Sequence, residues 1–355
     1  MTKVLVLGAG RIGVSIAQVL ADSGDYQVTL GEGMPEPPAA GGLGGVEHTV
    51  LDVNDAGALG RALGRVEVVI SALPYFLNVG VAEAAKASAV HYFDLTEDVH
   101  VARRVLALAD GADTVFVPQC GLAPGFISIA ANRLVRGFDQ PEDVRLRVGA
   151  LPQFPDNVLK YNLTWSTEGL INEYCNTCEA IHDGERRELL PLEGLEHFSL
   201  DGVDYEAFNT SGGVGTLCDT LDGRVRNLTY KTVRYPGHRD MIRMLVRDLK
   251  LCDRRDIFKD LIEHGIPVTR QDVVLIFVAV TGRRDGVLTQ ENYVKKIYGD
   301  AQGSGPSAIQ ATTAAGICAM VDLHREGKLP ATGFVRQEDT DLDDFIANRF
   351  GRVYA

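Results

Sequence analysis

The start of the chain constrains its fold more than any other stretch. Residues 3–7 are an apolar run, residues 8–13 read Gly-Ala-Gly-Arg-Ile-Gly, and an apolar helical pattern then continues to Leu20. A buried strand, a glycine-rich turn and an amphipathic helix in this order open a dinucleotide-binding βαβ unit. The three glycines serve, in turn, the tight turn, the close approach of a pyrophosphate, and the packing of the helix on the strand. The helix N-terminus offers N–H groups to the phosphates.

A carboxylate follows where such units bind a ribose. A second predicted strand, residues 27–30, leads to Glu32, about twenty residues beyond the last glycine of the turn. The Glu32 carboxylate can accept a hydrogen bond from a ribose 2′-OH, whereas it would repel a 2′-phosphate. Residues 33–40 contain no arginine or lysine, so we predict NAD as the cofactor. The alternative is a glycine-rich turn in an α/β fold that binds no cofactor.

Strand and helix patterns alternate through the following hundred or so residues, which predicts a parallel, doubly wound sheet of the Rossmann type. Further strands are predicted at residues 47–51, 66–71, 90–94 and 114–118. Ligands in such sheets bind at the carboxyl ends of the strands. The predicted cofactor-binding residues are therefore Gly8, Gly10, Arg11, Ile12, Gly13, Glu32, Asp52, Val53, Ser71, Ala72, Leu73, Pro74, Asp94, Leu95, Gly121, Leu122 and Ala123.

The pattern changes near residue 140 to strands of alternating character, interrupted by helices. Strands are predicted at residues 144–149, 159–165, 227–233, 273–280 and 291–296, and helices at 240–249 and 256–264. This pattern indicates an α+β domain with a mostly antiparallel sheet. A last helix, residues 307–325, has few charges and needs an apolar partner. We therefore expect a Rossmann NAD-binding domain at 1–130 and 305–355, with a substrate and dimerisation domain inserted at 131–304.

Composition excludes several classes of partner. The 355 residues carry a net charge of −13 without any block of lysine or arginine, so nucleic acid and anionic membrane surfaces are not expected to bind. No apolar run is long enough to span a membrane, and the N-terminus has no signal-peptide pattern. A cytoplasmic location follows, and the six cysteines are read as free thiols. Cys175, Cys178 and His182 lack a fourth ligand for a structural zinc site, so we expect no metal.

Five blocks of sequence carry a resemblance to a known family. They are residues 69–75 (VISALPY), 121–125 (GLAPG), 168–174 (EGLINEY), 208–213 (FNTSGG) and 230–238 (YKTVRYPGH). Together they resemble the saccharopine dehydrogenase family, and within it the lysine 6-dehydrogenases. The resemblance covers nearly the whole chain. It implies NAD(P)-linked oxidation of a carbon–nitrogen bond in lysine or a lysine adduct, an inserted substrate domain, and homodimers.

Such a reaction needs a group that takes a proton from the substrate amine and donors for the substrate carboxylate. His238 is the candidate base, because free imidazole titrates near neutrality. Arg234 is the candidate carboxylate ligand, because guanidinium binds carboxylate bidentately. Lys160 is the third candidate catalytic residue. The alternatives are a capping or packing histidine and a surface arginine.

Other residues are candidates for contact with a small amino acid substrate. They are Tyr75, Glu168, Thr210 and Ser211, together with Arg234. Glu168 alternatively serves only the dipole of the helix that it begins, and Thr210 and Ser211 alternatively belong to an ordinary glycine-rich turn. Arg224 and Arg226 are candidates to join Arg234 in a pocket for a substrate with several carboxylates.

These observations leave three functions open. The first is an NAD-dependent lysine 6-dehydrogenase that oxidises the ε-amine to a semialdehyde, which cyclises. The second is a saccharopine dehydrogenase, whose leaving amine is an amino acid. The third is a homologue that binds the dinucleotide without catalysis, because a fold alone does not imply a function.

Overall fold

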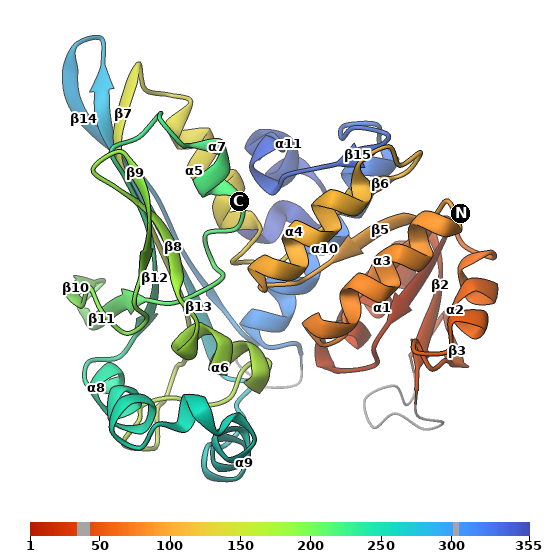
Figure 1. The fold of residues 1–355 in the computed structure, drawn as a ribbon, viewed down its shortest axis with the longest axis horizontal. Helices are drawn as coiled ribbons and strands as arrows, with labels where there is room; N and C mark the ends of the chain where they lie inside the picture. The colour runs from red at the N-terminus through yellow and green to blue at the C-terminus, as the bar shows by residue number, and fades with distance from the viewer. Residues whose placement is uncertain (34–42, 301–304) are drawn as a thin grey trace. The chain divides into compact units, whose positions relative to one another are not determined.

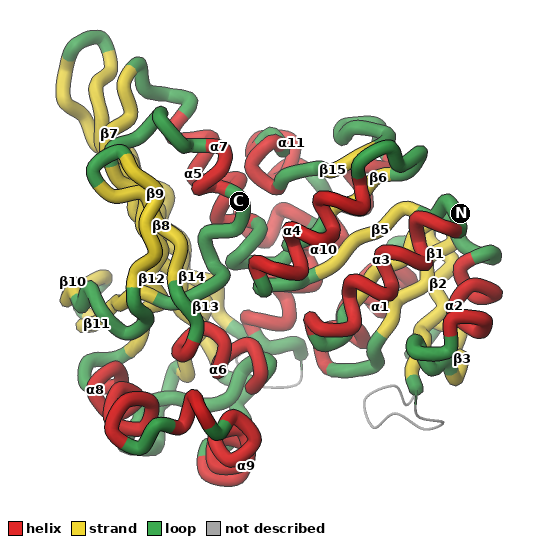
Figure 2. Tube along the Cα trace, in the orientation of Figure 1, coloured by secondary structure: helices red, strands yellow, loops and turns green. Residues whose placement is uncertain are grey.

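A computed structural model describes residues 1–33, 43–300 and 305–355 of the chain (Figure 1). The chain divides into two compact units. Unit 1 comprises Met1–Phe126 and Gln310–Ala355, and unit 2 comprises Ile127–Ile309. Both units combine helices with strands (Figure 2). Within the described ranges, no helix is both long and apolar enough to cross a membrane.

Unit 1 is built on a parallel sheet whose seven strands lie in the order β15-β6-β5-β4-β1-β2-β3. The strands are β1 (Thr2–Leu7), β2 (Tyr26–Glu32), β3 (Val46–Val50), β4 (Val68–Ser71), β5 (His91–Asp94), β6 (Val115–Val117) and β15 (Gly333–Phe334). Every neighbouring pair is parallel. The order β3-β2-β1-β4-β5-β6 is that of a doubly wound dinucleotide-binding sheet, which confirms the predicted fold class.

The helices of unit 1 connect β1 to β2, β3 to β4, β4 to β5 and β5 to β6, as a parallel sheet requires, and two more lie before and after β15. They are α1 (Arg11–Asp22), α2 (Ala56–Leu63), α3 (Asn78–Ala87), α4 (Val99–Ala109), α10 (Ala308–Arg325) and α11 (Leu342–Ala347), with 3-10 turns η1 (Tyr75–Leu77), η4 (Gln337–Asp339) and η5 (Gly351–Tyr354). Three aspartates set helix starts: Asp55 accepts hydrogen bonds from two N–H groups of α2, Asp98 accepts one from α4, and Asp341 accepts one from α11. Such caps satisfy N–H groups that no helical carbonyl can reach.

A buried carboxylate on α10 ties that helix to the rest of unit 1. Asp322 Oδ1 accepts a hydrogen bond from the Tyr26 hydroxyl at 2.6 Å, and Oδ2 accepts one from Asn348 Nδ2 at 2.9 Å. Arg325 and Arg349 donate to the same carboxylate from Nε, each at 3.0 Å. Burial alone raises the pKa of Asp322, but the hydrogen bonds from these four residues outweigh burial and lower that pKa.

Unit 2 contains a mixed, mostly antiparallel sheet in the order β10-β11-β12-β7-β13-β14, to which β8 and β9 are attached through β12. The strands are β7 (Gln140–Pro152), β8 (Cys178–His182), β9 (Glu185–Leu189), β10 (Glu196–Leu200), β11 (Val203–Asn209), β12 (Asn227–Arg234), β13 (Asp272–Arg284) and β14 (Val287–Tyr298). Only the pair β12–β7 is parallel. The sequence pattern missed β8 to β11, which form short hairpins with largely polar outer faces.

One predicted strand of unit 2 is wrong. Residues 159–165 form no strand, because Lys160 has a left-handed backbone with φ of +50°. A single bridge joins Leu163 to Val268, while Tyr161 and Leu163 pack into a core cluster.

The helices of unit 2 include those that the pattern placed at 240–249 and 256–264, with one change of type, and two that it missed, at 126–135 and 217–220. They are α5 (Phe126–Val135), α6 (Thr167–Cys175), α7 (Leu217–Thr220), α8 (His238–Arg243) and α9 (Arg255–Gly265), followed or joined by the π-helical turn η2 (Met244–Asp248) and the 3-10 turn η3 (Leu251–Asp253). The predicted helix 240–249 is thus α8 continued by a π-helical turn. Such turns are rare and widen the helix locally.

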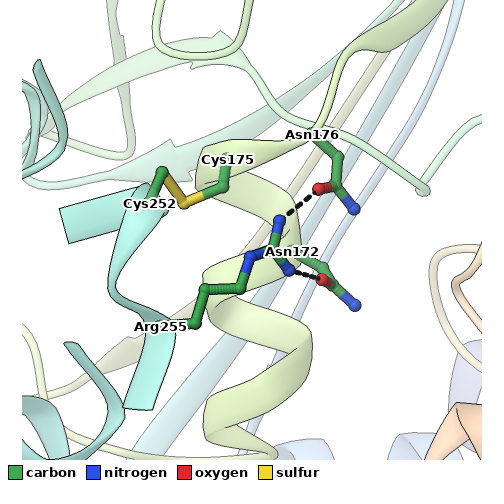
Figure 3. Close-up of a disulfide and its surroundings, with 5 residues drawn as sticks. All are labelled: Asn172, Cys175, Asn176, Cys252 and Arg255. Atoms are coloured by element: carbon green, nitrogen blue, oxygen red, sulfur yellow. Dashed lines mark hydrogen bonds between the residues drawn. A yellow bond between two sulfur atoms is a disulfide. The ribbon is translucent and has the colours of Figure 1, made fainter. Parts of the chain in front are cut away.

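The expectation of six free thiols is wrong for one pair. Cys175 at the end of α6 and Cys252 in η3 form a disulfide across 77 residues of sequence (Figure 3). Next to it, Arg255 donates to the side-chain oxygens of Asn172 and Asn176, each at 2.6 Å. Both contacts join α6 to the segment that leads into α9. The other four cysteines are free and buried.

The hydrogen bonds to the buried Asp322 carboxylate yield a prediction about the stability of unit 1. We expect Asp322→Asn to lower the free energy of unfolding by roughly 2–3 kcal/mol, because buried donors lose their charged acceptor. Urea unfolding measures the loss. Asp344→Asn is the matched control, since that carboxylate pairs with Lys328 at an exposed site and is worth little. Equal stability of the two variants would show that the hydrogen bonds to Asp322 do not hold α10 in unit 1.

Candidate functional site

The glycine turn of unit 1 has the geometry of a phosphate-binding loop. A Cβ on Gly13 would lie 1.8 Å from the carbonyl oxygen of Gly8, and one on Gly8 would lie 2.8 Å from the Ala72 oxygen. These two glycines are therefore required by packing. A Cβ on Gly10 would meet no atom within 4 Å, so Gly10 faces open space at the start of α1. That space is the cradle that a pyrophosphate requires.

The first turn of α1 has N–H groups that find no backbone acceptor among the described residues. Gly10 is the N-cap and supplies no side-chain cap. Within the described part of the chain, the N–H groups of Arg11, Ile12 and Gly13 donate no backbone hydrogen bond. The Arg11 side chain beside them is exposed. Unpaired N–H groups and the helix dipole at one point favour an anionic ligand.

Glu32 lies beside the glycine turn, where it was predicted to contact a ribose. It ends β2, and its Oε2 accepts a hydrogen bond from the Ala9 N–H at 2.8 Å while its Oε1 accepts one from the Gly33 N–H at 2.7 Å. The carboxylate thus lies directly beside the glycine turn. Residues 34–42, which follow, lie outside the described ranges.

Two further strand ends, those of β4 and β3, place predicted residues around the same edge of the sheet. Ser71 is buried and donates to Asn78 Oδ1 at 2.7 Å. Ala72 continues from it, with its N–H on the Leu7 carbonyl, while Leu73 and Pro74 extend from there. At the end of β3, the Asp52 carboxylate accepts from the Asn54 N–H, and Val53 packs on the core.

Asp94 at the end of β5 organises loops with its carboxylate. Its Oδ1 accepts from the N–H groups of Thr96 and Gln119, both at 2.9 Å, and its Oδ2 accepts from the Tyr92 hydroxyl at 2.7 Å. The side chain is fully buried, and burial raises its pKa. Asp94 therefore joins the segment that begins at Leu95 to the segment after β6. The groups that a ligand could contact here therefore belong to those two segments.

The loop after β6 has an unusual backbone. Gln119 has a φ of +64°, the Ala123–Pro124 peptide bond is cis, and Gly125 has a φ of +131°. A Cβ on Gly125 would lie 2.1 Å from the Gly121 oxygen. Gly121, Leu122 and Ala123 thus form a tight loop at the strand end. All predicted cofactor-binding residues lie in unit 1.

Two of the three predicted catalytic residues, Arg234 and His238, meet around a tyrosine to which the sequence pattern gave no role. Arg234 Nε donates to the Tyr174 hydroxyl oxygen at 3.2 Å, and that hydroxyl lies 3.0 Å from His238 Nε2. His238 Nδ1 lies 2.9 Å from the Leu159 carbonyl oxygen. A carbonyl can only accept, so Nδ1 carries the proton, and Nε2 accepts from Tyr174. The result is one chain of hydrogen bonds from Arg234 to Leu159.

Both charged groups of this chain are enclosed. Arg234 is 2% exposed and also donates to Thr232, to the Val233 carbonyl and to Glu173. His238 is 1% exposed. Burial, and then the nearby Arg234 charge, lower the pKa of His238 to about 3. The imidazole is therefore neutral at neutral pH and a weak base, since general bases work best with a pKa near the operating pH.

The remaining residues predicted for catalysis or substrate contact do not take part in this chain of hydrogen bonds. Lys160 is exposed, and its Nζ donates to the Pro236 carbonyl at 3.0 Å. Glu168 begins α6 and forms an ion pair with Lys259. Tyr75 begins η1 in unit 1. Arg226 pairs with Asp183 ahead of the first residue of β12, whereas Arg234 ends that strand. Arg226 and Arg234 therefore do not share a pocket.

Thr210 and Ser211 follow β11 in a buried loop. The Ser211 N–H donates to the Glu173 carbonyl at 3.1 Å, which joins this loop to α6. Thr210 Oγ1 is buried and has no hydrogen-bond partner among the described residues, and the same holds for Asn172 Nδ2 and Asn162 Oδ1. Buried polar atoms without partners are rare and mark places where a polar ligand or water belongs.

Another carboxylate that the sequence did not single out places His238. Glu206 on β11 accepts from the N–H groups of Gly237 and Arg239, at 2.8 and 2.6 Å. Gly237 has a φ of +97°, and α8 has no side-chain cap of its own. Glu206 thus fixes the start of α8 and, with it, the His238 ring. Nothing in the local sequence points to this contact, because the partner is 31 or more residues away.

The sheet order, the glycine turn and the free donors of α1 together define a pyridine-nucleotide-binding protein. Two family models match the chain: "Saccharopine dehydrogenase NADP binding domain" over residues 4–115 and "Saccharopine dehydrogenase C-terminal domain" over residues 121–352. The chain belongs to the saccharopine dehydrogenase family.

Curated relatives agree with this assignment at low identity. A saccharopine dehydrogenase (NADP⁺, L-glutamate-forming) from Pyricularia oryzae is 24% identical over 81% of this chain and 66% of its own length. The mitochondrial alpha-aminoadipic semialdehyde synthase of Bos taurus is 23% identical over 84% of this chain and 33% of its own length. The chain thus spans about two thirds and one third of these two relatives.

Solved structures show the same fold. The apo saccharopine dehydrogenase (L-Glu forming) of Saccharomyces cerevisiae matches with a TM-score of 0.80 and 18% identity, over 98% of this chain and 97% of that one. The homospermidine synthase of Legionella pneumophila, in complex with NAD, matches with a TM-score of 0.68 and 14% identity, over 99% and 89% of the two chains.

The open space at Gly10 gives a direct test of the cofactor site. Gly10→Ala should fold normally, because the new methyl meets no protein atom. The dissociation constant for NAD or NADP should rise by about tenfold or more, a loss of about 1.4 kcal/mol. Calorimetry measures it, with exposed Gly80→Ala in α3 as the control. Unchanged affinity would place the cofactor elsewhere.

The low pKa of His238 predicts how stability varies with pH. An unfolded histidine titrates near 6.5, whereas folded His238 has a pKa of about 3. Below about pH 6.5 the unfolded chain binds a proton that the folded chain does not, so this histidine removes about 1.4 kcal/mol of stability per pH unit down to about pH 3.

Replacing the imidazole should flatten that dependence. We expect His238→Gln to be less stable than the wild type at pH 7, since it loses the Tyr174 contact, but to lose less stability between pH 6 and pH 5. Urea unfolding at each pH measures the slope. The exposed His182→Gln serves as the control. An unchanged slope in the His238 variant would contradict the buried, neutral imidazole.

Proposed function

We propose that this protein is an NAD-dependent dehydrogenase that oxidises a carbon–nitrogen bond of an amino acid in lysine catabolism, namely a lysine 6-dehydrogenase. The product of ε-amine oxidation and hydrolysis is a semialdehyde, which cyclises onto its own α-amine. Family membership over nearly the whole chain supports the reaction class. The resemblance of its sequence blocks to lysine 6-dehydrogenases supports the substrate.

The position of Glu32 is the observation that supports NAD as the cofactor. Its carboxylate is held beside the glycine turn by the N–H groups of Ala9 and Gly33. A ribose 2′-OH can donate to this carboxylate, whereas a 2′-phosphate would bring two like charges together. At 4 Å that repulsion is about 4 kcal/mol at an effective dielectric of 20. One relative is named for NADP⁺ and one neighbour was solved with NAD, so Glu32 is the discriminating feature.

The residues of unit 1 hold the dinucleotide in this proposal. The free N–H groups at the start of α1 bind the pyrophosphate, and Glu32 binds the adenosine ribose. When bound, the nicotinamide accepts a hydride from the carbon that bears the amine. The chain itself supplies the orientation of the cofactor, the recognition of the amino acid and the path for the proton.

The residues of unit 2 bind the amino acid in this proposal. Arg234 supplies positive charge for a carboxylate, and the buried Thr210 hydroxyl supplies a polar contact. The Tyr174 hydroxyl links Arg234 to His238, so a proton accepted at the tyrosine oxygen can move on to Nε2. His238 is then the base, with Tyr174 as the intermediate group, and Lys160 is the alternative base.

Saccharopine dehydrogenase is the second candidate, because the relative from Pyricularia oryzae and the yeast structure carry that name. Saccharopine has three carboxylates and calls for several arginines. Arg226 is engaged with Asp183 at the far end of β12 from Arg234, which favours the substrate with one carboxylate. A homologue that only senses the dinucleotide is the third.

Two features of the cellular context belong to the same proposal. We propose that the chain acts as a homodimer, as the family resemblance implies. We also propose a cytoplasmic location. The disulfide between Cys175 and Cys252 is the observation that stands against a reducing cytosol.

A spectrophotometric assay tests the function. Reduction of NAD and NADP is followed with lysine, saccharopine and other diamines in turn. We expect turnover with lysine and NAD, and a preference for NAD that falls by about tenfold or more in Glu32→Gln, because the repelling charge is gone. Turnover of saccharopine alone selects the second candidate. Cofactor binding without turnover of any amine selects the third.

The assignment of the base has its own readout in that assay. Losing a general base costs about 10²–10⁴-fold in rate, so His238→Ala should lower kcat and leave the affinity for NAD unchanged. A variant that keeps more than about a tenth of wild-type kcat would exclude His238. Lys160→Ala would then be the variant to measure.

A further inference from the structure

The disulfide of unit 2 holds the two cysteines of the chain that solvent reaches most easily. All six cysteines lie within the described ranges, and the four free ones are at most 3% exposed. Burial raises the pKa of the Cys178 and Cys218 thiols to about 12. Cys175 and Cys252 are both partly exposed. Because thiol–disulfide exchange requires access for the attacking thiolate, we expect exchange at this pair and not at the other cysteines.

The disulfide joins the same two segments that the hydrogen bond between Tyr174 and His238 joins. Cys175 ends α6 and directly follows Tyr174. His238 begins α8, which continues through η2 to η3, where Cys252 lies. The Tyr174 hydroxyl lies 3.0 Å from His238 Nε2. The covalent link therefore limits how far the end of α6 can separate from the segment that begins at His238.

Few other contacts order the part of the chain around Cys252. Leu251 is the only buried residue among residues 244–257. Lys250 has a left-handed backbone with φ of +54°, which is unfavourable for a residue with a side chain. A segment with few buried contacts opens at a low cost in free energy. We therefore expect the disulfide to contribute much of the order of this segment.

Non-covalent contacts preserve the fold of unit 2 when the disulfide is absent. Beside the disulfide, Arg255 donates to the side chains of Asn172 and Asn176 (Figure 3). Helices α6 and α9 both contribute buried apolar side chains to one core cluster. Reduction should therefore loosen the end of α6 and η3 while the rest of the unit stays folded.

We propose that Cys175 and Cys252 form a thiol–disulfide exchange site that regulates the contact between Tyr174 and His238, with a dithiol as the reductant. The regulatory role rests on the proposed function, because that contact lies among the residues proposed to bind and oxidise the amine. In the oxidised form the contact is in place, and in the reduced form it is loosened. Disulfides of cytosolic proteins are usually transient and often redox-sensing, so such a site is compatible with the proposed cytoplasmic location.

The exchange proceeds in two displacements at sulfur. A thiolate of the dithiol attacks one sulfur of the pair, and the S–S bond breaks with its electron pair on the other sulfur, which takes up a proton. The second thiolate of the reductant then displaces the bound cysteine, whose sulfur also takes up a proton. The protein gains two electrons and two protons, and the reductant becomes a disulfide. Oxidation of the pair by a small disulfide is the reverse sequence.

Hydrogen exchange tests the loosening without requiring turnover. After treatment with dithiothreitol, iodoacetamide should label Cys175 and Cys252 of the wild type, and mass spectrometry should show faster exchange of the α6 and η3 amides. Cys252→Ser should exchange like the reduced wild type, with or without dithiothreitol. Cys178→Ser, which removes a nearby free thiol, should keep the wild-type response. Unchanged exchange on reduction, or a Cys252→Ser variant that still responds, overturns the proposal.

Two measurements test the effect on the site. The kcat for the amine should be higher in the oxidised than in the reduced wild type by about fivefold, the rate equivalent of one ordinary hydrogen bond. The NMR signals of the His238 ring should shift on reduction in the wild type and stay in place in Cys252→Ser. Equal kcat in the two forms, or unshifted His238 signals, overturns the regulation. Shifted signals without turnover of any amine would refute the proposed function and support the exchange site.

Discussion

The close approach of two glycines at the start of α1 is the contact on which unit 1 depends. Gly13 leaves no room for a side chain above the Gly8 carbonyl, so α1 packs directly on the end of β1. That contact points the helix N-terminus, with its unpaired N–H groups, at the carboxyl edge of the sheet. The position of every other loop at this edge, including Glu32 and the segment after Ser71, is set relative to that turn.

Unit 2 depends on buried polar contacts of a different kind. Arg234, Tyr174 and His238 form a chain of hydrogen bonds with almost no exposure to solvent. Glu206 fixes the start of α8, and Ser211 bonds to the chain of α6. A buried polar network of this type is stable only when its members find partners, which explains why it draws residues from four separate elements. The few atoms left without a partner are the places where a polar ligand gains most.

The comparisons and the structure bear on different levels of function. Family membership establishes a pyridine-nucleotide-binding unit and the C-terminal domain of the saccharopine dehydrogenase family. The identities of 14–24% to the relatives and solved structures named above leave the substrate to the site itself. Within the site, the Glu32 carboxylate beside the glycine turn and the enclosed Arg234 are the features that bear on cofactor and substrate.

The sequence alone determined the fold class, the glycine turn and the place of Glu32, because these rest on periodicity and on contacts between near neighbours in the chain. It also brought Arg234 and His238 together, four residues apart. Only the tertiary structure decided the disulfide between Cys175 and Cys252, the role of Tyr174 and the Glu206 cap, and the loss of the strand expected at 159–165. These features join residues that lie far apart in sequence, or rest on one left-handed backbone angle. No local pattern encodes them, because they depend on the register of strands that meet only after folding.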